Sequence, residues 1–534
     1  MLSKRVIVCV VIAIIFVSLF SGCILNQLFG TSFSWTSWEV VDDDGFASVS
    51  LTSSCSGAVI MDLYNPGGGL VDEEIFLAGN HEVILHLAPY REPVAPGQYT
   101  LRVYDVNDQE ISEKTFSFTD STLSLSSCDQ YWWKEKVWSN DYSLIGLHLV
   151  GHNNGDMPIY PQTVDVTIGS ETVSGFVLPA TILPGEITAV DCFVYREDAS
   201  VEDTFTISVK DSLGDILGNG SFSVEVENTV STTKFAWTHK GNDYRLTIPH
   251  PAFLFDYYSS IDRNQIRHED YGLYIFDVYD DDYLDLIIDH LMSNFNQEKA
   301  IDNINFAASF VQHLDYKLDS ETNDSFEYPR YPVETLFNGD DGGGDCEDKA
   351  ILMASVLDKL GYDVALFRLT GHMAVGVQLD EDATAYEYYA DNYYFLETTS
   401  EGSPCGLIPN DYESRSNLSV YPILSRPLLL HNWKNGTVSI FEQTELGDFV
   451  KATVFVKNLG SDTAKDVVVK AAFYTKNGLE LSTETTSISS LPPGMLTKVI
   501  LLADIPPGVT TWFKTNIYLD DEVVDEREAV SSFS

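Results

Sequence analysis

Hydrophobic and polar residues alternate along most of the chain in short runs that are separated by turn residues. Between Trp35 and Asp120 these runs include "FASVSL", "AVIMDLY", "EVILHL" and "GQYTLRVYD". A period of two residues is typical of strands with one buried and one exposed face. The pattern predicts an antiparallel β-sandwich over residues 35–120, a second over residues 121–232 and a third over residues 433–534.

Residues 233–432 follow a different pattern, which indicates helices as well as strands. One segment, "AIDNINFAASFVQHL", has apolar residues three and four positions apart, and "DKAILMASVLDKLGY" is apolar on nearly every side. The first spacing defines one helical face, and the second predicts a helix that neighbours bury all round. Strand-like runs follow, "DVALFRL", "HMAVGVQL", "AYEYY" and "YYFLETT". We therefore expect a multidomain protein whose α+β domain is flanked by β-sandwiches.

The second and third sandwiches share a turn pattern. "LVGHNNGDMPIYPQTVDVTI" and "VFVKNLGSDTAKDVVVKAAF" each contain a strand, an Asn/Gly turn and another strand, and each reaches a later Pro-Gly turn. The pair resembles the adhesion-type Ig-like modules that are common on prokaryotic surfaces. This resemblance implies that the flanking sandwiches are Ig-like.

The first residues have the outline of a secretory signal. Lys4 and Arg5 precede an apolar run over residues 6–20, and Ser21-Gly22-Cys23 follows. The small pair before a cysteine resembles a prokaryotic lipoprotein processing site, although Phe20 stands where that family prefers Leu. The resemblance implies a lipid on Cys23. We expect residues 1–23 to anchor the chain, residues 24–34 to act as a tether, and the rest to lie on the extracytoplasmic face of the cell membrane.

The net charge limits the possible partners. The chain has 80 acidic and 31 basic residues, for a formal net charge of −49. Such a charge opposes binding to polyanions, so nucleic acid is not an expected partner. The acidic runs lack the spacing of a calcium loop. We expect no cofactor and no metal ion, and the sequence leaves the oligomeric state open.

One cysteine stands where a helix is expected to begin. In "GGGDCEDKA", residues 342–350, Cys346 would lie in the first helical turn if Asp345 caps it, and the helix dipole there favours a thiolate. The neighbouring carboxylates raise the pKa of the thiol, so a nearby cation is required. His372, the first residue of "HMAVGVQL", is the candidate. Glu397, which ends "YYFLE", would orient the imidazole, with Asp391 as the alternative.

These residues together resemble the transglutaminase-like superfamily, a variant of the papain-like cysteine peptidase fold. The matching motifs are "GGGDCEDKAILMASVLDKLGYDVALFRL", "GHMAVGV" and "FLETT", and the resemblance covers about residues 235–430. It implies that Cys346 attacks an acyl carbon, that His372 activates it and then protonates the leaving group, and that Glu397 takes the place of the usual Asp. The backbone N–H of Cys346 is a natural oxyanion donor. Tyr331 is a candidate for the second donor.

Each residue also has a simpler interpretation. In an oxidising compartment Cys346 and Cys405 can form a disulfide, as can Cys128 and Cys192. His372 alone is more often a core histidine than a catalyst. A zinc site of Cys346, His372 and a carboxylate is chemically allowed, but no CxxC or HxxxH pair supports it.

The motifs predict a membrane-anchored, extracytoplasmic protein that performs thiol-dependent acyl transfer on peptides or proteins. Hydrolysis of amide bonds is favoured over cross-linking, because water is always present and no site for a second amine is evident. The alternative is a non-catalytic adhesion or scaffolding protein that uses the same fold for binding, since a fold does not fix a function.

Overall fold

The computed structural model describes most of the chain beyond residue 30. The described residues are 31–105, 107–135, 142–199, 204–226, 229–261, 263, 268–293, 295, 297–322, 327–339, 342–380, 384–413, 417–443 and 447–533. The predicted anchor over residues 1–23, with Cys23, lies outside these ranges. Within them, every helix is too short or too polar to cross a membrane.

The N-terminal region is built from two antiparallel sheets. Its strands are β1 (Phe33–Asp43), β2 (Phe46–Cys55), β3 (Val59–Tyr64), β4 (Leu70–Phe76), β5 (Gly79–His86), β6 (Gly97–Asp105) and β7 (Glu110–Phe118). The sheets have the orders β1-β2-β5 and β4-β3-β6-β7. Alternate residues of each strand, such as Val49 and Leu51 on β2 and Met61 and Leu63 on β3, form one shared core. The period-two pattern is thus explained by the face of each sheet that lines this core.

The next region is one curled sheet. Its strands are β8 (Leu123–Trp133), β9 (Tyr142–Asn153), β10 (Thr163–Ile168), β11 (Glu171–Val177), β12 (Ile187–Ala199), β13 (Thr204–Lys210) and β14 (Ile216–Ser223). They follow the order β14-β13-β10-β11-β12-β9-β8, and the two edge strands contact each other. The sheet is therefore a nearly closed barrel around its own core. The predicted two-sheet sandwich over residues 121–232 is wrong, because alternation along a strand fixes a buried face but not which strand lies across from it.

The C-terminal region is again a pair of sheets around a common core. Its elements are β21 (Leu429–Trp433), the short 3-10 helix η3 (Lys434–Gly436), β22 (Ser439–Gln443), β23 (Gly447–Asn458), β24 (Ala464–Tyr474), β25 (Glu480–Leu491), β26 (Leu496–Asp504), β27 (Trp512–Leu519) and β28 (Glu522–Glu528). Strands β21, β22 and β26 all pair with β23, while the other sheet has the order β25-β24-β27-β28. This arrangement fits the β-sandwich expected there.

The segment between the barrel and the last sandwich holds the described α-helices. Its elements are β15 (Thr232–His239), β16 (Asn242–Pro249), α2 (Ala252–Ser259), η1 (His268–Tyr274), α3 (Asp281–Ser293), α4 (Ala300–His313), α5 (Asp319–Thr322), α6 (Pro332–Phe337), α7 (Cys346–Lys359), β17 (Val364–Leu369), β18 (His372–Gln378), β19 (Tyr393–Leu396), η2 (Asn410–Tyr412) and β20 (Ser419–Ile423). The sheet order is β19-β18-β17-β20, and α7 packs on β17 and β18.

The predicted fold class is wrong for the chain as a whole. Strands make up 51% of the structure and helices only 15%, so the protein is mostly β rather than an α+β, papain-like fold between sandwiches. The helices are short apart from α3, α4 and α7, and a two-stranded ribbon, β15–β16, runs beside them. One buried helix gave a strong sequence signal, but the strands that surround it dominate the architecture.

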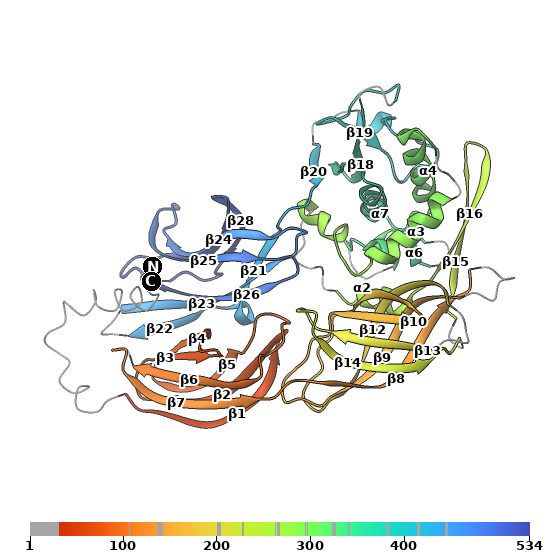
Figure 1. The fold of residues 1–534 in the computed structure, drawn as a ribbon. Coiled ribbons are helices and arrows are strands. Elements are labelled where there is room, and N and C mark those ends of the chain that lie inside the picture. The colour runs from red at the N-terminus through yellow and green to blue at the C-terminus, as the bar shows by residue number, and fades with distance from the viewer. Residues whose placement is uncertain are drawn as a thin grey trace.

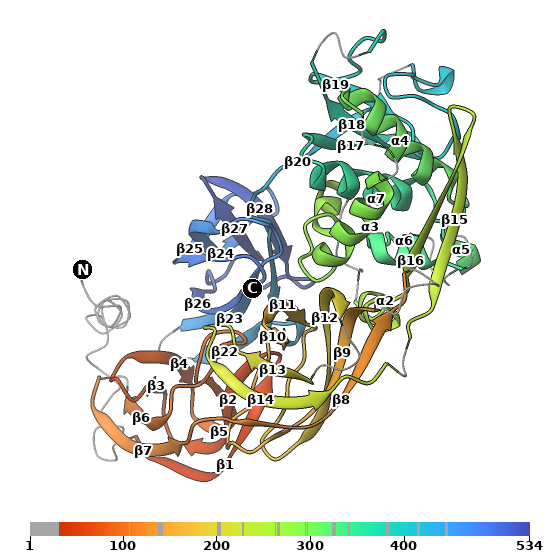
Figure 2. The same ribbon diagram turned by 45° about the vertical axis from the view of Figure 1, so that its right-hand side comes forward.

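The regions pack on one another rather than forming a string. Figure 1 shows the C-terminal sandwich lying on the N-terminal one, and the helical segment lying above the barrel. Figure 2 shows the same neighbours after rotation. Trp133, Ile145 and Phe193 of the barrel belong to the same core as the helices. This shared core supports the segment that carries the candidate site; the domain limits at 120, 232 and 432 stay a prediction.

Candidate active site

The start of α7 is fixed by a glycine-rich turn and a cap. Gly343 has a φ of 125°, and a Cβ there would overlap the carbonyl of Asp315. Asp345 is the N-cap, as expected, and its backbone N–H donates to Asp348 Oδ2 at 3.2 Å. Asp348 also pairs with the Arg330 guanidinium, and Arg330 N–H donates to Asp348 Oδ1 at 2.8 Å. These contacts hold the first turn, and with it Cys346, in one position.

The Cys346 thiol has two polar neighbours. Sγ lies 3.1 Å from Glu347 Oε2, to which it donates, and it accepts a hydrogen bond from the backbone N–H of Met373. Burial raises the pKa of the thiol well above its ordinary value, and the charge of Glu347 and then that of Asp345 raise it further. The thiol is therefore protonated at neutral pH in this arrangement, and the predicted activation by the helix dipole is outweighed.

His372 and Glu397 form a buried pair. His372 Nε2 lies 3.0 Å from Glu397 Oε2, and the hydroxyl of Thr399 donates to Glu397 Oε1 at 2.6 Å. Burial raises the pKa of Glu397, but the hydrogen bonds from His372 and Thr399 outweigh it and hold the pKa at about 2. An ionised Glu397 requires the proton on Nε2, so Nδ1 of a neutral imidazole carries the lone pair. Glu397 thus sets the tautomer that a general base needs.

The Cys346 thiol and the His372 imidazole both lie near the start of β18, and no hydrogen bond joins them among the described residues. Met373 belongs to the core under α7, and Cys346 packs against the same core. Sγ reaches the amide of Met373, one residue from the imidazole. Productive contact requires the thiol to turn away from Glu347.

The structure distinguishes between the two carboxylates considered for the third role. Asp391 lies exposed in the turn before β19, with a φ of 47°, whereas Glu397 directly follows β19 and contacts His372. Tyr331 packs its ring against Tyr258 and Tyr274, at centroid distances of 4.5 and 4.7 Å. Its environment is this aromatic cluster, so the structure offers no support for Tyr331 as an oxyanion donor.

The cysteines are unpaired in the described residues. Cys55, Cys128, Cys192, Cys346 and Cys405 are all free thiols. Cys128 lies on β8 and Cys192 lies on β12. These two strands pair with opposite edges of β9, so β9 lies between the two cysteines. The considered disulfides are therefore not formed, and Cys346 retains its thiol.

Several residues at the site were missed by sequence reasoning. The Tyr412 ring stacks on the His372 imidazole at 4.5 Å with an interplanar angle of 6°. Gln312 Nε2 donates to the carbonyl oxygens of Glu397 and Ser403, both at 2.8 Å. The half-exposed Tyr316 lies near Cys346 and the two carboxylates beside it. Tyr412 ends the three-residue 3-10 helix η2 and Tyr316 lies between α4 and α5, and such short segments have no periodicity that marks a residue as part of a site.

A second histidine shows that a similar set of residues can be purely structural. His431 Nδ1 lies 2.7 Å from Asp525 Oδ2, and its Nε2 lies 2.7 Å from Thr515 Oγ1. Thr515 is fully buried in the C-terminal core. A hydroxyl that no substrate reaches has no catalytic use, so this set braces the sandwich.

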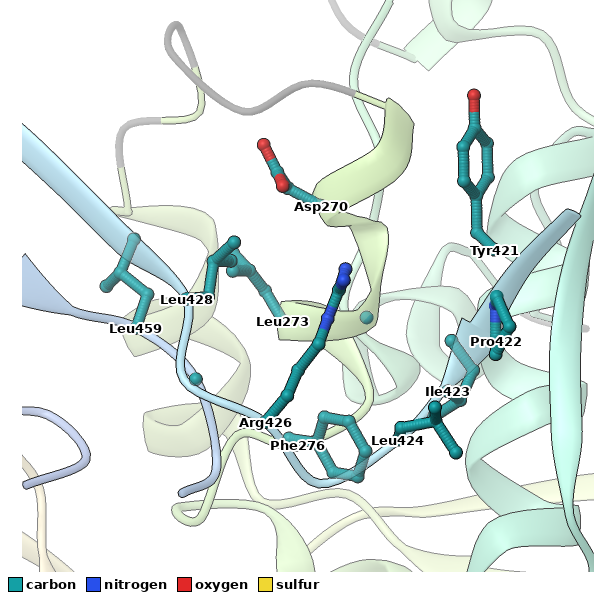
Figure 3. Close-up of a pocket in the computed structure, with 12 residues that line it drawn as sticks. Asp270, Leu273, Phe276, Tyr421, Pro422, Ile423, Leu424, Arg426, Leu428 and Leu459 are labelled. Carbon is teal, nitrogen blue, oxygen red and sulfur yellow. The ribbon is translucent and has the colours of Figure 1, made fainter. Parts of the chain in front are cut away.

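A pocket lies apart from the cysteine and histidine. It is formed where η1 and the chain after β20 meet the turn between β23 and β24, and its walls are mostly apolar (Figure 3). Asp270 and Arg426 add charged groups to the lining. None of its lining residues belongs to the Cys346, His372 and Glu397 set, so the pocket joins two regions of the molecule rather than extending the candidate site.

Comparison with known proteins leaves the family open. No protein-family model matches the sequence, and no curated protein matches it either. Among solved structures, the chain has a distant similarity to a transglutaminase from red sea bream, with 9% identity, a TM-score of 0.21, and coverage of 72% of this chain and 79% of that one. The YadV chaperone matches with 10% identity and a TM-score of 0.13, covering 36% of this chain and 99% of that one. Similarities this low carry no functional conclusion.

Proposed function

We propose that this protein catalyses thiol-dependent acyl transfer, with Cys346 as the nucleophile, His372 as the base and Glu397 as the residue that orients the imidazole. The observation that carries the proposal is the buried 3.0 Å pair of His372 Nε2 and Glu397 Oε2, one residue from the amide that holds the Cys346 sulfur. A base fixed by an acceptor, next to a free thiol at a helix start, is the arrangement that such chemistry needs.

In the proposed reaction, Nδ1 of His372 takes the thiol proton and the sulfur attacks the carbonyl carbon of an amide. The oxygen of the resulting tetrahedral intermediate is negative, and the backbone N–H of Cys346, in the first turn of α7, is its expected donor. The imidazolium then protonates the leaving amine, and the C–N bond breaks to give a thioester. Water, deprotonated by His372, hydrolyses the thioester and restores the thiol.

The first step of this scheme is a change of partner by the thiol. Its resting partner is the Glu347 carboxylate, which stabilises the protonated thiol, whereas the reaction requires the imidazole. Rotation about the Cys346 side chain is fast compared with turnover. Substrate that displaces Glu347 from the sulfur would therefore activate the site when it binds.

The expected substrate class is peptide or protein amides outside the cell, and hydrolysis is favoured over cross-linking. The N-terminal motif supports a lipid or signal anchor at the cell membrane with the remaining residues on the extracytoplasmic face. In that setting the β-rich regions would hold the site away from the membrane.

A non-catalytic scaffolding role is the second candidate. The specific observation in its favour is that the thiol donates to Glu347 and that burial and the neighbouring charges raise its pKa. A permanently protonated thiol would make the His372 and Glu397 pair a structural contact only.

Alkylation of the full-length chain by iodoacetamide distinguishes the two roles, with modification of the Cys346 peptide followed by mass spectrometry. Catalysis predicts rapid labelling that His372→Ala slows strongly. A matched control is His313→Ala, because His313 also pairs with a glutamate, Glu401 at 3.2 Å, but on the surface. If labelling is slow and indifferent to both substitutions, the scaffold is correct and the catalytic proposal fails.

A further inference from the structure

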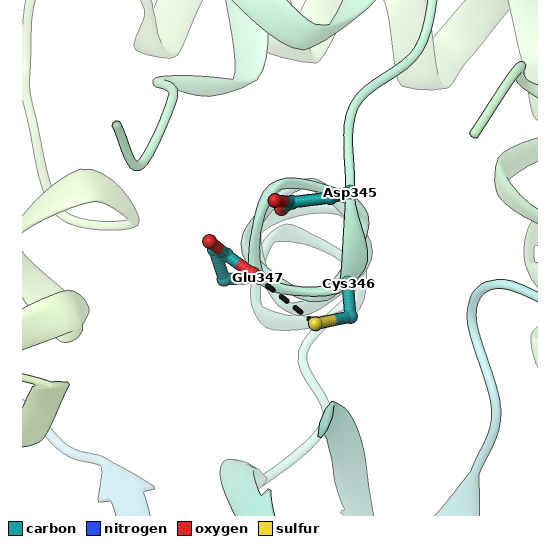
Figure 4. Close-up of side chains that lie close together, drawn as sticks. All are labelled: Asp345, Cys346 and Glu347. Carbon is teal, nitrogen blue, oxygen red and sulfur yellow. Dashed lines mark hydrogen bonds between the residues drawn. The ribbon is translucent and has the colours of Figure 1, made fainter. Parts of the chain in front are cut away.

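Three consecutive side chains at the start of α7 converge on one point. Asp345, Cys346 and Glu347 each offer a ligand atom, and these atoms all lie within 4.8 Å of one another. Figure 4 shows the Asp345 and Glu347 carboxylates on the same side of the helix start, with the Cys346 thiol hydrogen-bonded to Glu347. Adjacent residues of a continuous helix diverge, but Asp345 has extended backbone angles, φ −88° and ψ −156°, which let its side chain join the other two.

One oxygen of this group has no partner. Asp345 is only 8% exposed, and its Oδ1 is buried without a hydrogen-bond partner among the described residues. The helix cap accounts for one carboxylate oxygen at most. The Asp345 and Glu347 side chains also form a hydrogen bond with each other, and Glu347 is likewise 8% exposed. Two buried acceptors that face each other require either a proton or a cation between them.

The neighbouring protein cations are engaged elsewhere. The Arg330 guanidinium pairs with Asp348 and, at 2.8 Å, with Asp319. The Lys349 ammonium donates to the carbonyl oxygens of Gln312 and Leu314, at 3.1 and 2.7 Å. Neither supplies the missing partner of Asp345 Oδ1. Asp345 and Glu347 thus have no ion-pair partner among the described residues.

We propose that Asp345, Cys346 and Glu347 form a binding site for a thiophilic divalent cation of the Zn²⁺ class. A thiolate with two carboxylates selects Zn²⁺ or Cd²⁺ over Ca²⁺ and Mg²⁺, which prefer oxygen ligands alone. Binding replaces the thiol proton by a sulfur–metal bond and releases that proton to solvent, so affinity increases with pH. The regulatory consequence rests on the proposed function: a metal on Cys346 removes the nucleophile, and the cation is a reversible inhibitor.

Titration of the metal-free, full-length chain with Zn²⁺, followed by calorimetry, tests the site without reference to activity. We expect one Zn²⁺ per chain, no competition from Ca²⁺ or Mg²⁺, and loss of this binding in Cys346→Ala. Glu347→Gln and Asp345→Asn each weaken affinity by roughly tenfold or more. Asn is as good an N-cap as Asp, so Asp345→Asn keeps the helix start. Glu401→Gln, an exposed carboxylate outside the cluster, is the matched control and leaves affinity unchanged.

The outcomes separate this proposal from the catalytic one. Absence of saturable binding, or binding that survives Cys346→Ala or is indifferent to Asp345→Asn and Glu347→Gln, overturns the metal site and leaves a shared proton between the carboxyl groups. Protection of Cys346 from iodoacetamide by Zn²⁺ supports it even if His372→Ala proves the thiol non-catalytic. Failure of the proposed function thus leaves the binding result intact.

Discussion

Glu347 controls the state of the Cys346 thiol at the scale of a single residue. Its carboxylate accepts the thiol hydrogen bond at 3.1 Å and, after burial, is the largest influence that raises the thiol pKa. Glu347→Gln removes this charge, so the pH midpoint of Cys346 alkylation is expected to fall. The rate at neutral pH increases by roughly tenfold for each unit by which the pKa falls.

Asp411→Asn is the control for this experiment, because Asp411 is exposed beside Tyr412 and does not contact the sulfur. The midpoint is measured from the alkylation rate of the Cys346 peptide between neutral and alkaline pH. An unchanged midpoint in Glu347→Gln would show that burial alone holds the proton on the thiol.

Glu397 should make the folding stability of the protein depend on pH in the acidic range. Its pKa in the folded chain, about 2, is below the ordinary value of 4.5. A depressed carboxyl pKa contributes stability that is present above pH 4.5 and is lost as the pH falls toward 2, and the size here is on the order of 3 kcal/mol. We expect wild type to exceed Glu397→Gln in melting temperature at pH 7, with a gap that closes on acidification. If the difference in melting temperature between wild type and Glu397→Gln does not change with pH, the ionised pair of Glu397 with His372 is not the cause of that difference.

The three residues proposed for the site, and the contact between His372 and Glu397, could be predicted from the sequence, whereas the other contacts of these side chains could not. Cys346 and His372 could be named because each begins an element that the hydrophobic pattern predicts, and Glu397 because it directly follows one. The hydrogen bond of the thiol to Glu347 depends on a side-chain rotamer, and the stacking of Tyr412 on His372 depends on the position of the short 3-10 helix η2. Neither feature produces a periodic pattern of hydrophobic residues in the sequence.

At the scale of elements, the start of α7 depends on the glycine turn. Gly343 combines a φ of 125° with the carbonyl of Asp315 where a Cβ would lie. Gly343→Ala is expected to cost about 1–3 kcal/mol and to disturb the position of Cys346. Gly361→Ala is the matched control, because its φ is 84° but nothing lies near the added Cβ. Melting temperature and Cys346 alkylation should both change more in Gly343→Ala; equal effects would show that backbone strain alone matters.

Five of the six elements that the sequence analysis expected in the middle segment are present, and one is not. The two helices expected from periodicity are α4 and α7, and Gly361 follows the second with a positive φ. The strand expected at "AYEYY" is absent from the described residues there. Tyr388 and Tyr389 instead use their hydroxyls to donate to the carbonyls of Leu379 and Tyr412, at 2.8 and 2.7 Å. Side-chain hydrogen bonds to the backbone thus hold a loop where composition favours a strand.

At the scale of the molecule, strand patterns predicted the β-rich regions but not how they close or pack. Closure of the barrel requires β8 to contact β14. Packing of the C-terminal sandwich on the N-terminal one requires contacts between residues that are hundreds of positions apart in the sequence. Such pairings depend on surface complementarity between distant segments. Hydrophobic alternation is the same whichever partner a strand finds.

A buried ion-pair group joins the first and last regions. Lys498 on β26 lies 2.7 Å from Asp72 and 3.2 Å from Glu74, both on β4, and Lys451 pairs with Glu74. Burial raises the pKa of Glu74, but the charges of Lys498 and Lys451 outweigh it and leave the pKa below its ordinary value. The contribution of Glu74 is therefore present above its ordinary pKa and is lost as the pH falls through the lower folded value.

Lys498→Ala removes the cation that faces both carboxylates and leaves them buried with one positive partner fewer. Breaking a buried pair leaves the remaining charge buried without full compensation. We therefore expect the free energy of unfolding to fall by about 3–5 kcal/mol, which calorimetry would detect as a lower unfolding temperature at neutral pH. Lys470→Ala breaks the pair with Glu480, whose side chains are 21% and 36% exposed, and should cost under about 1 kcal/mol. If the two variants unfold alike, the two sandwiches do not depend on these charges, and apolar contacts alone hold the ends of the chain together.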